Sequence, residues 1–477
     1  MLFARFLRAR DAARNLLLVF QGNSKVATAT QALQHYLEGF TSLEKSAPSR
    51  QHPWLRKLRQ DAFARFAETG FPTTRDEDWR FTNLSTIAQT PFRLVHNGHH
   101  LPSRSDIAPY HVAGAACQLV FVDGRFAPEV SSFGRLPDRV TITNLAAEIE
   151  RRPAVVEQHL GRYLNIQRDA FSALNTAFIE DGAYVHIPKS VVLEGPVHLL
   201  FISMGHDTPA VSHPRNLIVA EENSQATIVE DYISLGGAGE KALCNTVTEL
   251  VAGDHSVISH YMIEREHGQA FNMSTLRIQQ GRAADVSSHS VLIGGALVRN
   301  NVHPVLAGEG SECLINGLFI GTGRQHLDNY MLVEHASPHC GSRQFYNGIL
   351  DGHAHGVFHG RIIVHKDAQK TDAKQTNRNL LLSDTAQIDT KPQLEIYADD
   401  VKCTHGATMG QIEENALFYL RSRGIDETSA RRLLLGAFAG ECFDRMKEGP
   451  ARKHVENLVR EDLRRIAYST RPEERVA

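Results

Sequence analysis

Residues 222–228 (ENSQATI), 253–258 (GDHSVI), 281–286 (GRAADV) and 308–314 (GEGSECL) share one pattern: a turn residue, a small polar residue, and then apolar residues at alternate positions. The copies start roughly 27 to 31 residues apart, a spacing within the range of a solenoid coil. Less evenly spaced copies follow at 352–357 (GHAHGV) and 383–388 (SDTAQI). A recurring unit of this length indicates that the chain winds into a stack of similar turns.

The whole stretch from Gln118 to Gly410 consists of short β-rich runs broken by Gly, Asn and Asp. After about residue 178, no amphipathic helix of about ten or more residues interrupts it. A sheet of local hairpins would need tight two-residue turns, yet Asn316-Gly317 and Asn347-Gly348 each lie inside what reads as a continuing strand. Crossovers between parallel strands are overwhelmingly right-handed. We therefore predict a mainly β protein built on a right-handed parallel β-helix, a solenoid.

Helical patterns flank this stretch on both sides, so we expect amino- and carboxy-terminal α-helical regions. Upstream, the apolar residues with helical spacing are Leu33, Tyr36, Leu37, Phe40, Leu55, Leu58, Phe63 and Phe66. The segment Gly70–Thr74 then breaks the pattern. Downstream, Glu413 to Arg423 is expected to be a helix with Gly424 as its C′ residue. The two helices expected after it have apolar faces formed by Ala430, Leu433, Leu434, Ala437 and Phe438, and by Val455, Leu458, Val459, Leu463 and Ile466.

These patterns predict four parts of the chain. Residues 28–114 form an amino-terminal helical region and linker, residues 115–410 the β-helix, and residues 411–477 a carboxy-terminal helical domain. Residues 1–27 have two readings. They are either a disordered or over-long terminus, or an organelle transit peptide, because Arg5, Arg8, Arg10 and Arg14 alternate with apolar residues and only Asp11 opposes them.

Composition excludes several classes of protein. The 477 residues include 51 Lys and Arg against 54 Asp and Glu, and no basic run among aromatic residues suggests a nucleic-acid groove. The longest clear apolar run, Leu16 to Phe20, is far shorter than the roughly 20 residues that span a bilayer, so we expect no membrane insertion. The six cysteines are scattered and form no CxxC, which argues against a disulfide framework or a zinc knuckle. We expect reduced thiols and a cytoplasmic location.

Motifs for catalysis are missing from the sequence. The glycines at 294–295 and 321–323 lack the context and the lysine of a phosphate-binding loop, so we expect this chain to bind no nucleotide. There is neither a GxSxG elbow nor an HExxH helix. A β-helix enzyme acting on polysaccharides would need clustered carboxylates and bases, and a hexapeptide-repeat acyltransferase would need a six-residue aliphatic period. The sequence offers neither, and we predict a protein that is not an enzyme.

Histidines concentrate near residue 350 and allow two interpretations. The set comprises His335, His339, His353, His355, His359 and His365, together with Cys340. Imidazole is a favoured ligand of borderline divalent ions, so one interpretation is a metal site. The other is that these are structural or surface side chains on the exterior of the coil, where stacked polar residues are ordinary. Sequence spacing leaves both interpretations open.

The segment 400–410 (DVKCTHGATMG) ends the β-rich stretch and carries a thiol and an imidazole. Cys403 and His405 are two residues apart, and on an extended strand such residues point to the same face. Both side chains could therefore meet one ligand or one partner surface. A strand-edge thiol that fills space beside an exposed imidazole is the alternative reading.

Several segments resemble one known family. They are DVKCTHGAT (400–408), LFYLRSRGI (417–425) with the helix from Ala430, GFPTT with DEDW (70–79), LNTAF with DG and IPK (174–189), and HKDAQKTDA with the Asn377 to Ser383 segment (365–383). Together they resemble the SufB/SufD family of iron-sulfur cluster assembly scaffolds, and within it the SufD branch, over about residues 30 to 470. In SufB-type chains the segment matching 405–408 looks like His-Glu-Ala-Thr. Here Gly406 replaces the acid, which favours SufD.

This resemblance implies a non-enzymatic subunit that pairs with a SufB-like paralogue through its carboxy-terminal coils, with a homodimer as the alternative in isolation. His405 would be a transient ligand of a nascent iron-sulfur cluster at that interface, facing a cysteine of the partner, with Cys403 as a weaker neighbour. The helical tail would bind the SufC ATPase, whose movement would open the interface. The residues implied in that contact are Tyr419, Arg421, Arg423, Leu433 and Phe438. The resemblance also implies a reduced flavin in the complex.

Overall fold

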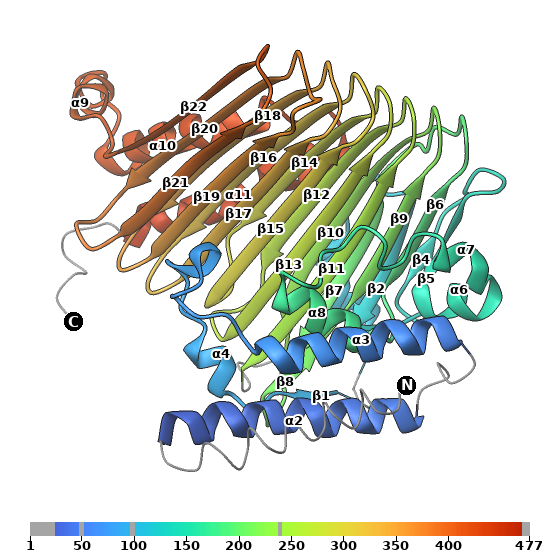
Figure 1. Ribbon diagram of the computed structural model, residues 1–477. Coiled ribbons are helices and arrows are strands. Elements are labelled where there is room, and N and C mark those ends of the chain that lie inside the picture. The colour runs from blue at the N-terminus through green and yellow to red at the C-terminus, as the bar shows by residue number, and fades with distance from the viewer. Residues whose placement is uncertain (1–23, 47–51, 96–100, 237–240, 470–477) are drawn as a thin grey trace.

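A parallel β-helix forms the centre of the molecule, and helices from both ends of the chain pack on its outside (Figure 1). The computed structural model describes residues 24–46, 52–95, 101–236 and 241–469. The expectation for residues 1–27 falls mainly on residues 1–23, which lie outside the described part. The predicted fold class, mainly β with a parallel solenoid and flanking helices, is confirmed.

The chain alternates between two sheets, so that each turn of the solenoid contributes one strand to each. In order of pairing, sheet A contains β21 (Gln387–Ile396), β19 (His355–Val364), β17 (His326–His335), β15 (Leu297–Leu306), β13 (Ala270–Gln280), β11 (Ala242–Ala252), β9 (Arg215–Ala220), β6 (Ala183–Ile187) and β5 (Thr141–Asn144), with β8 (Ala210–Ser212) beside β11 and β1 (Arg93–Leu94) beside β8. Sheet B contains β22 (Lys402–Gly410), β20 (Asp372–Leu381), β18 (Gly341–Leu350), β16 (Glu312–Gly321), β14 (Asp285–Leu292), β12 (Val257–Arg265), β10 (Gln225–Leu235), β7 (Val197–Met204), β2 (Cys117–Val122) and β3 (Arg125–Phe126), with β4 (Ser132–Phe133) beside β2.

The sequence repeat corresponds to the turn that leads into each strand of sheet B. Gln225, Val257 and Asp285, the first residues of β10, β12 and β14, are paired in register, so one turn takes roughly 30 residues. The small polar residue of the repeat closes the turn. The Ser224 hydroxyl donates to the carbonyl of Glu221 at 2.6 Å, and that of Ser256 donates to the carbonyl of Gly253 at 2.8 Å. The predicted period is confirmed. In the copy at 281–286, Ala284 takes the place of the serine and the turn is closed by a backbone hydrogen bond from its N–H to the carbonyl of Gly281.

The two later copies of the repeat belong to the other sheet. Residues 352–357 lead into β19, and residues 383–388 lead into β21, which are strands of sheet A. Their uneven spacing from the earlier copies therefore reflects a different corner of the coil. The sequence pattern alone does not distinguish the two corners, because both place a turn before an alternating strand.

Most of the amino-terminal helices pack on the outer face of sheet A. The amino-terminal helices are α2 (Ser24–Ser46), α3 (Pro53–Thr69), η2 (Glu77–Trp79), α4 (Ser85–Gln89), α5 (Arg104–Ile107), η3 (Ala108–Tyr110), α6 (Leu145–Arg151), α7 (Pro153–Glu157) and α8 (Ala170–Ala177), of which α5 and η3 lie on the side of sheet B. Phe40 of α2 stacks on Phe63 of α3, and both pack against Phe178. The helical spacing read from the sequence is confirmed, and Gly70 ends α3 with a positive φ of 63°.

Residues 76–82, here named the strap, cross the outer face of sheet A toward its last strands (Figure 1). Trp79 lies 3.8 Å below the guanidinium of Arg299 on β15. The Thr82 hydroxyl donates to Asp328 Oδ2 on β17 at 2.5 Å. Glu77 forms an ion pair with Lys391 on β21. The strap thereby ties the amino-terminal region to the strands at the far end of the solenoid.

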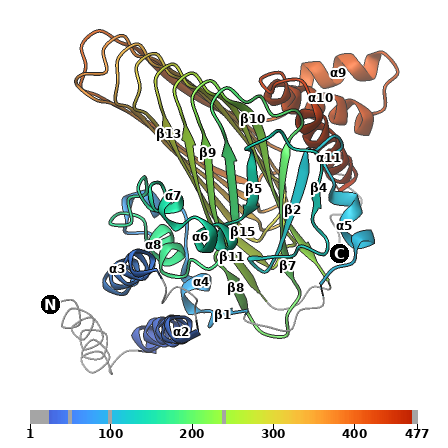
Figure 2. The same ribbon diagram turned by 90° about the vertical axis from the view of Figure 1, so that its right-hand side faces the viewer.

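The carboxy-terminal helices α9 (Glu414–Ser422), α10 (Glu427–Phe443) and α11 (Pro450–Ser469) lie on the side of sheet B (Figure 2). Gly424, with φ 86°, follows α9 as predicted, and Pro450 begins α11. The face predicted for α11 is confirmed. The face predicted for α10 is partly wrong: Leu433 is 54% exposed and Leu435 is buried instead. Helix α10 contacts sheet B mainly through its second half. The residues that it buries therefore differ from the apolar residues predicted from the helical spacing.

Two asparagines of sheet B hold α10 in place. Asn316 Nδ2 donates to the carbonyl of Cys442 at 2.9 Å, and Asn347 Nδ2 donates to the carbonyl of Phe438 at 2.8 Å. Each asparagine precedes a glycine whose missing side chain leaves room inside the solenoid. A Cβ on Gly317 would lie 2.0 Å from the ring of Tyr346. The prediction that both Asn-Gly pairs lie within strands is confirmed.

Candidate functional site

The two ends of the solenoid differ in how their strand edges are covered. At the amino-terminal end, the short antiparallel strands β3 and β4 pair with β2, and β5 pairs with β6. At the other end, β21 pairs with β19 and β22 pairs with β20. In the part of the chain that the structure describes, no strand pairs with their outer edges. We name the surface formed by β21 and β22 the open end.

Strand β22 places Cys403 and His405 on one face at the open end. Cys403 pairs in register with Ala373, and His405 with Gln375. Both partners on β20 are buried inside the solenoid. Side chains paired in a parallel sheet point to the same side, so Cys403 and His405 continue the interior columns at the last turn. Met409 belongs to the same face.

The residues on this face differ in access to solvent. His405 is exposed, and Met409 is 60% exposed, because no further turn covers them in the described part of the chain. Cys403 is half-buried against the interior core. Burial raises the pKa of the Cys403 thiol, so the thiolate that binds metals is disfavoured there. Of the two predicted residues, His405 is the better placed ligand for an incoming group.

An amide ladder lies directly beneath His405. Gln375 is 1% exposed, and its Nε2 donates to Gln344 Oε1 on the next strand inward at 2.7 Å. Gln375 Oε1 is buried and has no hydrogen-bond partner among the described residues. Neither glutamine was a candidate from the sequence. Gln375 lies about one coil period before His405, which is the signal that points to it once the repeat is known.

The helical residues expected to face an ATPase are mostly on the surface. No residue of α9 is buried in the structure, and Tyr419 is 57% exposed. Arg423 lies over the Tyr419 ring at 5.2 Å, and Arg421 pairs with Glu427 at 3.3 Å. Phe418, which the sequence analysis did not select, is 74% exposed, and Leu433 of α10 joins the same exposed set.

Phe438 is placed differently from the other four predicted residues. It is 9% exposed and packs against sheet B, and the guanidinium of Arg378 lies 5.5 Å from its ring. Arg378 also forms an ion pair with Glu441. Phe438 therefore stabilises the attachment of α10 to the solenoid. The exposed surface consists of Phe418, Tyr419, Arg421, Arg423 and Leu433, and we name it the helical-tail surface.

The histidines near residue 350 bind other side chains one by one. His355 Nε2 lies 2.8 Å from Asp389 Oδ2, and His359 Nε2 lies 2.8 Å from Gln393 Oε1 on the outer face of sheet A. His335 Nε2 lies 2.8 Å from Ser342 Oγ inside the solenoid. Among the described residues, no group of three or more His, Cys, Asp or Glu side chains is arranged to hold a metal ion. His335, His355 and His359 therefore have the separate protein contacts that the structural interpretation expects.

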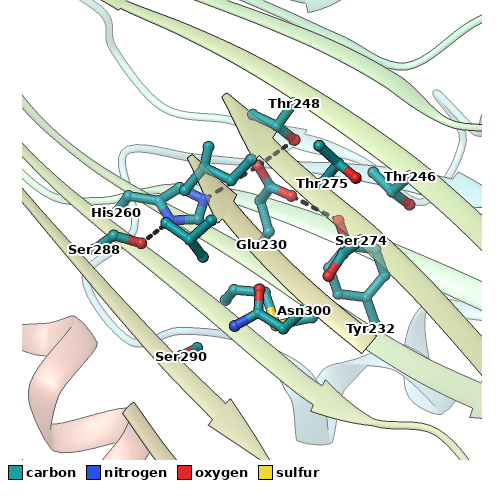
Figure 3. Close-up of a pocket in the computed structure, with 13 residues that line it drawn as sticks. Glu230, Tyr232, Thr246, Thr248, His260, Ser274, Thr275, Ser288, Ser290 and Asn300 are labelled. Carbon is teal, nitrogen blue, oxygen red and sulfur yellow. Dashed lines mark hydrogen bonds and ion pairs between the residues drawn. The ribbon is translucent and has the colours of Figure 1, made fainter. Parts of the chain in front are cut away.

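A buried carboxylate and imidazole lie inside the first turns of the solenoid (Figure 3). Glu230 accepts hydrogen bonds from Tyr232 at 2.6 Å and Thr248 at 2.8 Å, and its Oε1 lies 3.2 Å from His260 Nε2. Burial alone would raise the pKa of Glu230, but these hydrogen bonds outweigh it and lower the pKa below its usual range. The cavity beside them measures about 10 Å³, which is space for one water. This arrangement fits a satisfied polar core.

Comparison with known proteins finds two family models that together cover most of the chain. Residues 30–199 match the model of the SufBD protein N-terminal region, and residues 201–438 match the SufBD core domain, described as SUF system FeS cluster assembly. The chain is 36% identical to an iron-sulfur cluster assembly SufBD family protein of Synechocystis, over 82% of this chain and 87% of the relative. The chain belongs to the SufBD family. Within it, the chain is 30% identical to the iron-sulfur cluster assembly protein SufD of Escherichia coli, over 90% and 96% of the two chains.

The SufD likeness extends to more distant relatives. The Bacillus subtilis SufD protein is 25% identical over 89% of this chain and 97% of its own length. The two SufBD models together leave outside them the first 29 residues and those after 438. Most of α10 precedes residue 438, whereas α11 follows it. Among the helices that the structure describes for this SufBD family member, none is long and apolar enough to cross a membrane.

Proposed function

We propose that this chain is a SufD-like scaffold subunit that supports iron-sulfur cluster assembly together with a SufB-like paralogue and a SufC-like ATPase. The proposal treats the chain as a non-enzymatic subunit in the cytoplasm, with nucleotide bound by the ATPase alone. Family membership and the SufD relatives support this assignment. The observation that carries it is the open end. There, no strand of the described chain covers the outer edges of β21 and β22, and β22 carries the exposed imidazole of His405.

The open end has the properties of a docking surface for the paralogue. Unpaired strand edges present backbone N–H and C=O groups that another chain can pair with, and β-strand addition is a common mode of association. Met409 and Tyr397, which are 60% and 63% exposed, supply apolar surface next to those edges. When the paralogue is absent, the same edges can accept a second copy of this chain, which is the homodimer that the proposal includes.

The cluster is the cargo of this interface. Iron-sulfur clusters bind soft thiolate ligands, and imidazole serves as an alternative ligand to iron. In the proposal, His405 supplies one ligand from this chain, and a cysteine of the paralogue supplies another. A site shared between two chains can release its cluster when the chains separate. The helical-tail surface is where the ATPase would bind and drive that movement.

Two pockets of the described chain lie away from the open end. The interior cavity has room for one water, and a second pocket, of about 300 Å³, lies between α2 and β1 in the amino-terminal region. That pocket is far in the fold from β22 and is lined mainly by apolar residues such as Phe92 and Leu94. No step of the proposal uses a flavin from this chain. The reduced flavin stays a prediction about the complex.

The test compares two histidines in the purified three-subunit complex. We expect His405→Ala to leave the complex assembled and to lower the amount of cluster formed in anaerobic reconstitution by about tenfold or more, because a ligand is lost. The readout is visible absorbance with iron and sulfide analysis. His353→Ala is the matched control, since His353 is an exposed imidazole in a turn of the same solenoid. Undiminished cluster formation by the His405 variant would remove the proposed role.

A further inference from the structure

We propose that Gln375 positions His405, by accepting a hydrogen bond from the imidazole N–H that does not face the cluster. This inference rests on the proposed function and adds a residue of this chain to the site. The hydrogen bond would fix which ring nitrogen carries the proton and direct the other nitrogen toward the partner. Histidine ligands of metals almost always have such an outer partner.

The position of Gln375 follows from strand register. It pairs with His405 in β22 on one side and with Gln344 in β18 on the other. Neighbouring strands lie about 4.8 Å apart, so the side chains of paired residues on one face can reach each other. Only one further turn of the described chain lies beyond Gln375, yet its Oε1 is closed off from solvent. The described chain around Gln375 therefore already shields its Oε1, and His405 is the residue paired with Gln375 on the last strand of sheet B.

The orientation of the Gln375 amide is held from two directions. Its Nε2 is engaged by Gln344 Oε1, so the remaining acceptor is Oε1. Across the interior, Gly360 of β19 leaves the space that the amide occupies, since a Cβ there would lie 1.9 Å from Gln375 Nε2. The amide of Gln375 is thus fixed in the core, and its Oε1 has no hydrogen-bond partner in the described chain.

Two neighbouring polar residues on this face are already satisfied, whereas Gln344 Nε2 on the next strand inward is buried without a hydrogen-bond partner in the described chain. Asn379 Nδ2 donates to Asn377 Oδ1 at 2.7 Å, and Asn377 Nδ2 donates to the carbonyl of Tyr346 at 3.2 Å. Across the interior, Thr390 Oγ1 of β21 is another unpartnered polar atom near the open end. Thr390 therefore provides the natural control, because its hydroxyl oxygen is buried, lies close to the same end, and lacks a partner among the described residues.

Docking of a partner makes the hydrogen bond necessary. His405 is exposed in the single chain, so water satisfies both of its nitrogens. A partner chain that closes over the open end removes that water. One nitrogen would then face the cluster, and the N–H of the other would be buried without an acceptor unless Gln375 provides it. An unpaired buried donor carries a substantial free-energy cost, which would weaken the ligand.

The experiment measures the contact separately from the cluster. In the intact three-subunit complex without cluster, exchange of the His405 ring C2 hydrogen is followed by mass spectrometry, which reports the state of a single imidazole. We expect Gln375→Met, which keeps the shape and removes the acceptor, to speed this exchange several-fold, and Gln375→Glu to restore slow exchange. Thr390→Val should match the wild type. In reconstitution, Gln375→Met should form about tenfold less cluster, the usual effect of removing an outer partner.

The outcomes separate this inference from the function on which it rests. Equal exchange in the wild type and Gln375→Met, or a faster rate in Thr390→Val instead, would overturn the positioning role. If exchange responds as expected but neither Gln375→Met nor His405→Ala lowers cluster formation, Gln375 positions the imidazole and the ligand role of His405 fails. Loss of folding in Gln375→Met would be seen as loss of complex, and Gln375→Glu then decides between the outcomes.

Discussion

The amino-terminal end of the solenoid is closed, whereas its carboxy-terminal end is open. Short antiparallel strands cover β2 and β6, and Ile142 of β5 is buried against the interior core. At the open end, the described chain leaves β21 and β22 with one partner strand each. No residue of β22 is fully buried, whereas all six residues of β2 are. The same repeating fold therefore ends in two different ways.

The difference supports the proposal that the open end receives another chain. Exposed strand edges favour unwanted association, and proteins usually cover them with short strands, bulges or charged residues. This chain covers one end and leaves the other with an imidazole, a thiol and Met409 on its inner face. The strap strengthens that end from outside without covering its edges. A docking surface needs strands that are held in place and edges that stay accessible, and β21 and β22 meet both conditions in the described chain.

The strap offers the largest expected effect. Trp79→Ala removes a buried indole that packs on Arg299 and Phe171, and we expect a loss of about 3 to 5 kcal/mol in the free energy of unfolding. Chemical denaturation measures the loss. Amide hydrogen exchange should rise in β15 to β21, because the strap contacts these strands.

Two further results sharpen this prediction. Lys391→Ala removes only the partly exposed ion pair with Glu77 and should change the free energy of unfolding far less than Trp79→Ala does. If the faster exchange in Trp79→Ala is confined to α8, where Phe171 lies, the strap does not support the open end.

A pair of exposed apolar residues compares the two ends directly. Met409→Asp at the open end should weaken association with the paralogue by about 100-fold, because an uncompensated charge would be buried at the interface. Phe133→Asp at the closed end, where the phenyl ring is 50% exposed, should leave the affinity unchanged. Isothermal titration calorimetry with the purified paralogue measures both. Equal losses at the two ends would contradict the assignment of the open end as the interface.

A buried acid near the closed end predicts a pH dependence. Burial raises the pKa of Glu266 from the usual 4.5 to about 7, while Ser203 and Asn272 donate hydrogen bonds to it. The unfolded chain loses this proton above pH 4.5, but the folded chain holds it up to about pH 7. Wild-type stability therefore falls as pH rises through this window.

Glu266→Gln removes this titration while keeping the shape of the protonated acid. Its stability relative to the wild type should rise by about 1 kcal/mol per pH unit between about pH 5 and 7, and reach about 2 kcal/mol. Denaturation midpoints across the pH range give the result. A difference that does not vary with pH would show that Glu266 is ionised in the fold.

Local sequence signals predict the fold well because they act at short range. In the turns that contain Ser224, Ser256 and Ser311, the serine hydroxyl donates to a carbonyl three residues earlier, so these turns can be recognised in the sequence. The helix caps at Gly70 and Gly424 are equally local. The face of α10 was predicted less well because it depends on where the helix meets sheet B, and Asn316 and Asn347 decide that from more than 90 residues away.

At the candidate site, too, the local features could be predicted from the sequence and the long-range contacts could not. Alternation along one strand puts Cys403 and His405 on a shared face, and that much is readable from two residues. The importance of Gln375 depends on strand register across about one coil, and the room for its amide depends on Gly360 in the opposite sheet. The separate partners of His355 and His359 are likewise set by register with β21. Spacing in the sequence could not distinguish these contacts from a metal cluster.

The most direct test of the docking claim is photo-crosslinking from the two ends in living cells. A benzophenone amino acid replaces Met409 at the open end in one strain and Phe133 at the closed end in another, and mass spectrometry identifies the crosslinked chains. We predict a crosslink from position 409 to a SufBD family paralogue and none to that chain from position 133. A crosslink to the paralogue from position 133 with none from position 409 would contradict it.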